Sequence, residues 1–125
     1  MMPYADTDFF LAMAKKEDWL KSGAEKIYTE NKGKIDTSII TLLELFLLSE
    51  RKGLDPESIV GSVFKVANVE RLSITEAMQI AHNIKHEGIN VFDAFHAALA
   101  ADREIISSDS VYDRLGKTRI GLSKA

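Results

Sequence analysis

The sequence predicts an α/β fold in the form of a three-layer sandwich, with a central, mainly parallel β-sheet flanked by helices. Short apolar segments of strand length alternate with longer segments whose apolar residues recur at helical spacing. Neighbouring parallel strands need a crossover of a dozen or more residues, which these helical segments provide. A chain of 125 residues suits a single domain, residues 1–125, with one core. Binding sites in such folds lie beyond the carboxyl ends of the strands.

The first half of the chain contains two predicted strands and several helices. Residues 3–5 are expected to form a strand, followed by a helix from about Phe9. A second helix is expected within residues 17–31 and a second strand at residues 35–36. In residues 38–50 the apolar side chains occur nearly all round the helix, which predicts that this helix is buried.

The second half of the chain adds a pair of helices and a short carboxyl-terminal group of elements. Residues 56–67 and 75–86 are expected to form two helices that pack as a pair over one side of the sheet. Asn90 can cap a further helix that reaches about Ala101. The remaining predicted elements are a strand at residues 104–107, a helix at 110–115 and a last strand at 119–122.

Composition excludes several kinds of site. The chain has no cysteine, so any metal must be held by oxygen or imidazole ligands. No basic region followed by an apolar one opens the sequence, and no apolar run approaches the roughly 20 residues that span a bilayer. We therefore expect a cytoplasmic protein with no membrane partner. The net charge of −3 is unlike that of many nucleic-acid binders, but two bound divalent cations would bring it to about +1.

Four acidic residues stand in positions that suggest a metal site. Asp6 and Asp109 each follow a predicted strand, which places them at the carboxyl edge of the sheet. Asp93 lies in the first turn of a later helix, and Glu44 interrupts the apolar helix, where a lone buried carboxylate is unfavourable. Clustered acids repel one another unless a cation gathers them, and oxygen ligands select Mg²⁺ or Mn²⁺. A pair of such ions activates water and stabilises the leaving oxygen of a phosphodiester.

Each of these acids also has an ordinary structural explanation. Asp6 and Asp109 are well placed to cap the helices that follow them, and Asp93 complements a helix dipole. Glu44 would lie on a solvent-facing stripe or meet a basic partner such as Arg51. Under this interpretation the protein is a non-catalytic RNA-binding or assembly module.

Four stretches of the sequence resemble, in order and separation, the signature segments of the PIN-domain family and of its VapC-type ribonucleases. They are residues 6–11 (DTDFFL), 38–45 (SIITLLEL), 93–100 (DAFHAALA) and 107–109 (SSD). The resemblance extends from Tyr4 to Leu122 and implies a PIN-like fold for the single domain. It implies that Asp6, Glu44, Asp93 and Asp109 are the metal ligands and catalytic residues, and that Thr7 and Ser107 orient them.

The same resemblance implies an activity and partners. The protein would be a ribonuclease that hydrolyses RNA phosphodiester bonds with Mg²⁺ or Mn²⁺, and it would be the toxin of a toxin–antitoxin pair with an antitoxin protein as partner. The roles of Asp8, Asp113 and His96 stay open, since a histidine at this place more often packs against a neighbour than it binds metal. His82 and His86 have a spacing that can bind zinc, but no third ligand is evident.

Two groups of residues are candidates for contacts with other molecules. Basic residues near the acids can hold RNA phosphates, although solvated surface charge is the ordinary explanation; they are Lys15, Lys16, Arg114, Lys117 and Arg119. Apolar residues of the predicted helix pair exceed what one buried face needs, and they are Ile59, Val63, Phe64, Met78, Ile80 and Ile84. They can form a homodimer contact or a groove for an antitoxin helix, but ordinary core is the interpretation that the pattern favours.

Two other α/β families place acids at the same edge of the sheet. A phosphatase of the haloacid dehalogenase type also has Asp-x-Asp after its first strand, but this chain has Phe10 where that family has a hydroxyl residue. A receiver domain needs a phosphorylatable aspartate at the end of a middle strand, whereas Asp55 precedes Pro56 at a predicted helix start. An aspartyl phosphatase with Asp6 as nucleophile therefore remains the less favoured enzyme.

Overall fold

The computed structural model describes residues 1–15, 19–72 and 74–122, and its strands form one all-parallel sheet. The strands are β1 (Tyr4–Ala5), β2 (Asp36–Ser38), β3 (Asn68–Glu70), β4 (Ile105–Ile106) and β5 (Arg119–Ile120), in the spatial order β3-β2-β1-β4-β5. Tyr4 of the central strand lies opposite Asp36 on one side and Ile105 on the other. The residues that follow β1, β2 and β4 therefore meet at one edge of the sheet.

Helices connect the strands, and several begin at polar caps. They are α1 (Thr7–Ala14), α2 (Lys21–Glu30), α3 (Ile39–Lys52), α4 (Pro56–Val66), α5 (Ala77–Glu87), α6 (Val91–Ala100) and α7 (Val111–Arg114), with a 3₁₀ turn, η1 (Ile74–Glu76), before α5. Side-chain oxygens of Asp6, Ser38, Asp55 and Asn90 accept backbone N–H groups in the first turns of α1, α3, α4 and α6. Residue 17, where the second helix was expected to begin, lies outside the described residues.

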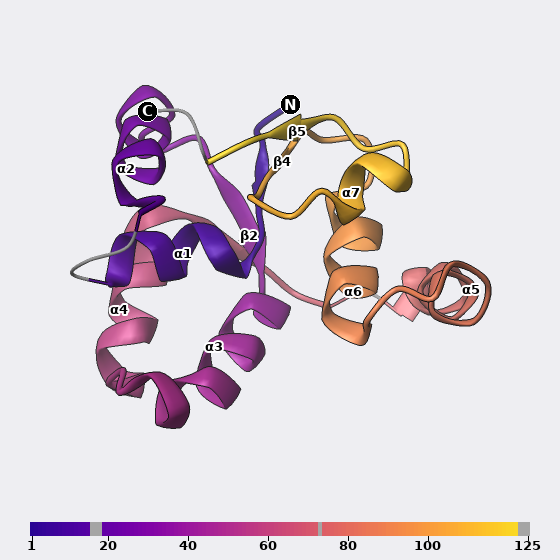
Figure 1. Cartoon of the computed structure of the whole chain (residues 1–125), viewed down its shortest axis with the longest axis horizontal. Coiled ribbons are helices and arrows are strands. Elements are labelled where there is room, and N and C mark those ends of the chain that lie inside the picture. Colours follow the sequence, from indigo (N-terminus) through magenta and orange to yellow (C-terminus); the bar gives the residue numbers. More distant parts are fainter. Residues whose placement is uncertain (16–18, 73, 123–125) are drawn as a thin grey trace.

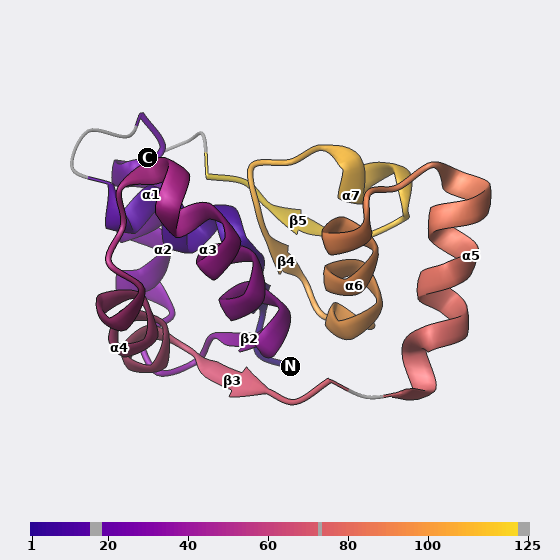
Figure 2. The same ribbon diagram turned by 90° about the horizontal axis from the view of Figure 1, so that it is seen from below.

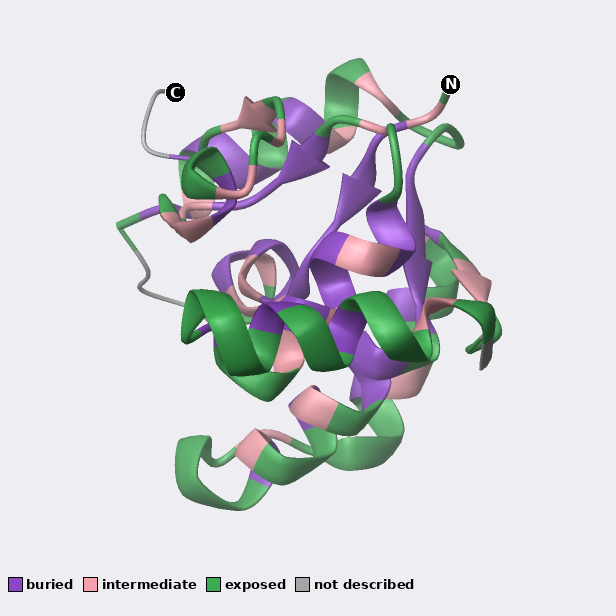
Figure 3. Cartoon of the chain, turned by 90° about the vertical axis from the view of Figure 1, so that its right-hand side faces the viewer, coloured by how far each residue is buried: buried purple, intermediate pink, exposed green. Residues whose placement is uncertain are grey.

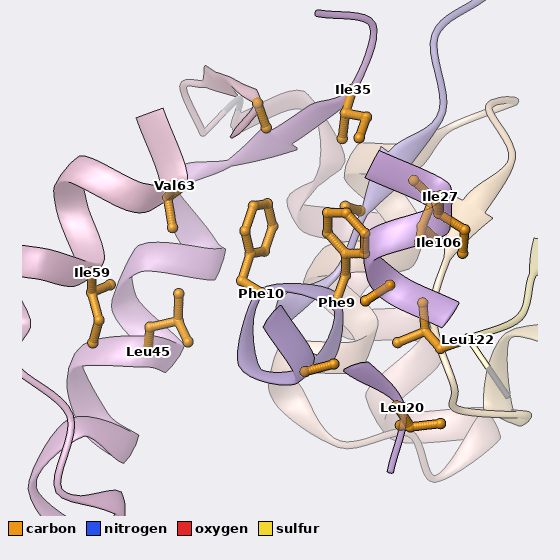
Figure 4. Packing of buried hydrophobic residues seen from close by; sticks show 14 of the residues in the cluster. Phe9, Phe10, Leu20, Ile27, Ile35, Leu45, Ile59, Val63, Ile106 and Leu122 are labelled. Carbon is orange, nitrogen blue, oxygen red and sulfur yellow. The ribbon is translucent and has the colours of Figure 1, made fainter. Parts of the chain in front are cut away.

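The helices form two layers around the sheet, as predicted. Helices α1, α2 and α4 lie on one face, and α6 and α7 lie on the other with α5 outside α6 (Figures 1 and 2). Successive strand residues point to opposite faces, so Tyr4 packs toward α6 and α7 while Ala5 joins the larger core. Phe9 and Phe10 of α1 lie inside that larger core (Figure 4). Figure 3 shows exposed residues mainly on the helices, and the inner strands β1, β2 and β4 are buried, so the three-layer α/β fold is confirmed.

The expected pairing of the helices at residues 56–67 and 75–86 is wrong. Helix α4 packs against α3, and α5 packs against α6, so the two lie at opposite ends of the molecule (Figure 2). The physical reason is strand β3, which the sequence patterns did not predict. Residues 68–70 pair with β2 after α4, and the chain then continues to the opposite face of the sheet.

The expected burial of the helix at residues 38–50 is also wrong. Ile40, Leu42 and Leu45 of α3 are buried, but Leu43 and Leu47 are 49% and 66% exposed. Helix α3 starts at the end of β2 and projects beyond the edge of the sheet (Figure 1), so only one of its faces meets the core. None of the described helices is long and apolar enough to cross a membrane.

Candidate active site

Asp6 lies at the carboxyl end of β1 and is almost fully buried, with 5% of its surface exposed. Its Oδ1 accepts the backbone N–H of Asp8 at 3.0 Å, which caps α1, and its Oδ2 accepts the Ser107 hydroxyl at 2.9 Å. Burial, and next the charge of Asp8, raises the pKa of Asp6 well above the ordinary value for aspartate. The capping role expected for Asp6 is real, but it occupies only one of the two oxygens.

Hydrogen bonds of Ser107, the residue that follows β4, link Asp109 to Asp6. The Ser107 hydroxyl accepts the backbone N–H of Asp109 at 2.9 Å while it donates to Asp6. Asp109 Oδ1 in turn accepts the N–H of Val111 at 2.9 Å, at the start of α7. The parallel register that sets Ala5 opposite Ile106 places these two acids at neighbouring strand ends.

Asp93 lies in the first turn of α6, where its backbone N–H donates to Asn90 at 3.0 Å. The phenol of Tyr112 donates to its Oδ1 at 3.3 Å. The pKa of Asp93 is raised by partial burial and then by the charges of Asp109 and Glu44. Burial and the charges of Asp6 and Asp93 raise the pKa of Tyr112, which keeps its phenol protonated as a donor. Asp93, Asp109 and Glu44, from three separate segments, therefore act on one another electrostatically.

Glu44 faces this group from α3, and its side chain is 23% exposed. Its Oε1 accepts the Thr7 hydroxyl at 2.5 Å and lies 3.1 Å from Nε2 of His96. The basic partner of Glu44 is thus the buried His96 of α6 rather than Arg51. Sequence patterns gave no signal for this contact because the two residues are 52 positions apart and belong to different helices.

Asp8 is a further acid at the same edge. Its Oδ2 accepts both the backbone N–H of Ser108, at 2.9 Å, and the Ser108 hydroxyl, so it fastens the turn after β4 to α1. Its Oδ1 is buried and, within the part of the chain that the structure describes, has no hydrogen-bond partner. A buried carboxylate oxygen without a donor is unfavourable unless a cation or water meets it.

The oxygen-rich donor set fits a hydrated hard cation. Within residues 1–15, 19–72 and 74–122, no three acidic or histidine side chains close on one point as a complete metal shell would. Mg²⁺ usually keeps several water ligands and takes only one or two carboxylates directly, so a complete protein shell is not required. The raised pKa values of Asp6 and Asp93 and the unpartnered oxygen of Asp8 are conditions that a nearby cation relieves. Whether the four acids bind metal stays a prediction.

The basic residues expected to hold phosphates make contacts within the chain. Arg119 forms a two-pronged ion pair with Asp113 at 3.1 and 3.2 Å and donates to the Ser107 carbonyl. Arg114 donates to the carbonyl of Glu87, and Lys117 to that of Ala101. Lys16 lies outside the described residues.

The other candidate residues lie away from the acids. The exposed rings of His82 and His86 lie with centroids 4.6 Å apart on α5. Of the apolar residues expected at an interface, Ile59, Val63 and Ile80 are buried, whereas Phe64 and Met78 are exposed. The apolar residues of α4 and of α5 thus include both ordinary core residues and exposed surface residues.

Two hollows of about 260 and 280 Å³ lie beside α1 and α4, and neither is lined by any of the four acids. One lies between α1, α3 and α4, the other between α1, α2 and α4, and Phe10 and Ala14 line both. The acidic edge and these hollows are therefore separate features of the surface.

Comparisons with known proteins agree with this architecture. The PIN domain family model matches residues 4–118. Among solved structures, the VapC20 toxin of Mycobacterium tuberculosis, described as cleaving the sarcin–ricin loop, superposes with a TM-score of 0.79 at 18% identity, covering 94% of this chain and 97% of that one. DNA-bound VapBC of Salmonella typhimurium gives 0.74 at 19% identity, covering 98% and 99%. A toxin–antitoxin complex of Klebsiella pneumoniae gives 0.74 at 14% identity, covering 98% and 99%. No curated protein sequence matches this one.

Proposed function

The chain belongs to the PIN domain family, and from this premise we propose that it is a divalent-metal-dependent ribonuclease that hydrolyses phosphodiester bonds of RNA. The observation that carries the proposal is the electrostatic coupling of acids from distant segments at one edge of the sheet. The charges of Asp109 and Glu44 both raise the pKa of Asp93, and Asp6 is joined to Asp109 through Ser107. Capping alone needs no such grouping, since each helix start requires only one oxygen.

The residues of the site would divide the work between binding and orientation. Asp6, Glu44, Asp93 and Asp109 would hold Mg²⁺ or Mn²⁺, directly or through water. The bound cation would supply the positive charge that activates water and stabilises the leaving oxygen. Ser107 fixes the rotamer of Asp6 by its hydrogen bond, and Tyr112 does the same for Asp93. Because the cation would activate water, no side chain needs to act as a nucleophile.

We further propose that the protein is the toxin of a toxin–antitoxin pair and acts as a homodimer. The solved structures that it resembles include a toxin–antitoxin complex of Klebsiella pneumoniae and DNA-bound VapBC of Salmonella typhimurium. The two hollows beside α1 and α4 offer apolar contacts to a helix of such a partner. The exposed apolar side chains of α3, including Leu43, Phe46 and Leu47, offer a separate surface for a second copy.

Cleavage of RNA under metal control tests the enzymatic proposal. The purified chain is expected to cut single-stranded RNA in Mg²⁺ or Mn²⁺, to stop when the metal is chelated, and to resume when metal is restored. Asp93→Asn is expected to lose cleavage by a factor of at least about 100 with its circular dichroism spectrum unchanged, because a carboxylate that holds the cation is lost. Cleavage that persists with chelator or in this variant would refute the assignment, and a covalent phospho-Asp6 would favour the phosphatase.

A further inference from the structure

A buried chain of hydrogen bonds leads from the backbone of α3, through two strands and α6, to the carboxylate of Glu44. The backbone N–H of Ile40 donates to Ser38 Oγ at 3.3 Å, and Ser38 Oγ lies 2.7 Å from the phenol of Tyr4. The Tyr4 phenol lies 2.8 Å from Nδ1 of His96, and Nε2 of His96 lies 3.1 Å from Glu44 Oε1. Tyr4, Ser38 and His96 are at most 1% exposed, so water does not compete for these bonds.

The direction of donation is set at the Glu44 end of this chain and is compatible with the other end. Ser38 Oγ accepts from the Ile40 backbone and still has its own hydrogen to donate to the Tyr4 oxygen, which lets the Tyr4 phenol donate to Nδ1 of His96. At the other end a carboxylate can only accept, so Nε2 of His96 carries the hydrogen that faces Glu44. Burial raises the pKa of Tyr4, which agrees with a phenol that remains a donor.

These hydrogen bonds hold one carboxylate oxygen of Glu44, Oε1, and leave the other oxygen available to a ligand. Thr7 and His96 both contact Oε1 of Glu44, at 2.5 and 3.1 Å, and Nε2 of His96 also lies 3.1 Å from the Thr7 hydroxyl. The side chain of Glu44 is partly exposed, at 23%, so without these contacts it could adopt other rotamers. A carboxylate held by a buried partner is oriented before it meets a ligand, and such partners strengthen metal binding.

We infer that His96 is a positioning residue, which donates its Nε2 hydrogen to Glu44 and aims the free oxygen of that carboxylate at the metal. The inference rests on the proposed function, because it assigns a role to a neighbour of one proposed ligand. The inference also gives Tyr4 and Ser38 a role at the site, since their hydrogen bonds favour the tautomer of His96 that carries its hydrogen on Nε2. His82 and His86 of α5 are exposed and do not belong to this chain of hydrogen bonds.

A matched pair of amide variants separates positioning from simple packing. The amide nitrogen of glutamine reaches the place of Nε2, so His96→Gln keeps a donor for Glu44, whereas the shorter His96→Asn reaches only the place of Nδ1. Binding of Mn²⁺, measured by calorimetry without substrate, is expected to weaken about 10- to 100-fold in His96→Asn and to recover most of this loss in His96→Gln. Exposed His82→Asn serves as the control and is expected to bind as the wild type does.

A second measurement does not depend on metal or on cleavage. Nitrogen NMR of the ring of His96 in the whole protein is expected to show a hydrogen on Nε2, with Nδ1 unprotonated. Tyr4→Phe is expected to raise the population with a hydrogen on Nδ1, because the donor to that atom is lost. A hydrogen found only on Nδ1 in the wild type would overturn the inference.

The outcomes separate the two proposals. If Glu44→Gln weakens Mn²⁺ binding but His96→Asn does not, the positioning role is refuted and the proposed function stands. Equal losses in His96→Asn and His96→Gln also refute it, because both would reflect packing. If Glu44→Gln binds Mn²⁺ as tightly as the wild type, Glu44 is no ligand, and the role assigned to His96 falls with that part of the proposed function.

Discussion

The hydroxyl of Ser107 donates to Asp6 Oδ2 at 2.9 Å and joins the ends of β4 and β1 across 101 positions of sequence. Both side chains are buried. Ser107 also accepts the backbone N–H of Asp109, so one hydroxyl serves two of the proposed metal ligands. Loss of this hydroxyl would therefore affect the fold and the site together.

Ser107→Ala is expected to reduce the free energy of unfolding by about 1–3 kcal/mol, because it leaves a buried carboxylate oxygen and a backbone N–H without a partner. Urea unfolding measures this loss. Ser22→Ala, at an exposed position of α2, is the matched control and is expected to change stability by less than about 0.5 kcal/mol. Equal stability of Ser107→Ala and the control would contradict the assigned bonds.

Asp6→Asn is expected to change how stability depends on pH. Because burial and Asp8 raise the pKa of Asp6 above its ordinary value of 3.8, the folded chain holds the proton of Asp6 over a range where the unfolded chain has lost it. Stability contributed by this group is therefore present below 3.8 and is lost as the pH rises through the raised pKa. In chelator, Asp6→Asn should gain stability relative to the wild type as the pH rises over that range.

Asp113→Asn provides the control of opposite sign for the same measurement. The Arg119 guanidinium holds the pKa of exposed Asp113 below its ordinary value, so its small contribution is present at neutral pH and is lost on acidification. Asp113→Asn should therefore lose stability relative to the wild type as the pH rises. Parallel stability curves for the wild type and Asp6→Asn would show that Asp6 does not titrate abnormally.

Arg103 forms ion pairs with strands β2 and β3, and its substitution tests how much these pairs stabilise the fold. It donates to Asp36 at 2.8 Å and to both oxygens of Glu70 at 2.9 Å, and its guanidinium lies 5.4 Å from the centre of the Tyr4 ring. Arg103→Ala is expected to lower the free energy of unfolding by about 2–4 kcal/mol, because Asp36 is left buried and unpaired. Arg103→Lys should recover only part of this loss, since lysine lacks the planar fork. Thermal and urea unfolding that match the wild type would contradict this account.

Leu47→Glu tests the proposed homodimer. Leu47 is 66% exposed on α3, so a charge there is expected to leave the fold intact but to oppose burial in an interface. Sedimentation should show a dimer for the wild type and at least a tenfold weaker association for the variant, which corresponds to about 1.4 kcal/mol. Trp19→Glu, at an apolar position outside α3 that is 79% exposed, is the control. Unchanged association of Leu47→Glu would exclude α3 from the interface.

The sequence predicted the architecture of this chain better than the packing of its helices. The alternation of strand and helix segments and the caps at Asp6 and Asn90 are local features, and the structure has them. Strand β3 was missed because Asn68-Val69-Glu70 has no apolar alternation and is held by pairing with β2. The burial of α3 was overestimated because periodicity cannot tell whether an apolar side meets the core or a partner.

The candidate site was predictable as a list of acids but not as a set of contacts. Asp6 and Asp109 follow strands, and parallel register brings strand ends together, so their meeting could be expected. The pairing of Glu44 with His96 and the bond from Tyr112 to Asp93 depend on how α3, α6 and α7 pack. No pattern within one helix encodes such distances.

The most direct test of the central claim is anomalous diffraction from crystals of the protein grown with Mn²⁺. The account predicts a manganese peak at the carboxyl edge of the sheet, bound directly or through water by Asp6, Asp93 and Asp109, with Glu44 facing it. A crystal at saturating Mn²⁺ that shows no peak among these acids, or their carboxylates turned to separate surfaces, would contradict the account.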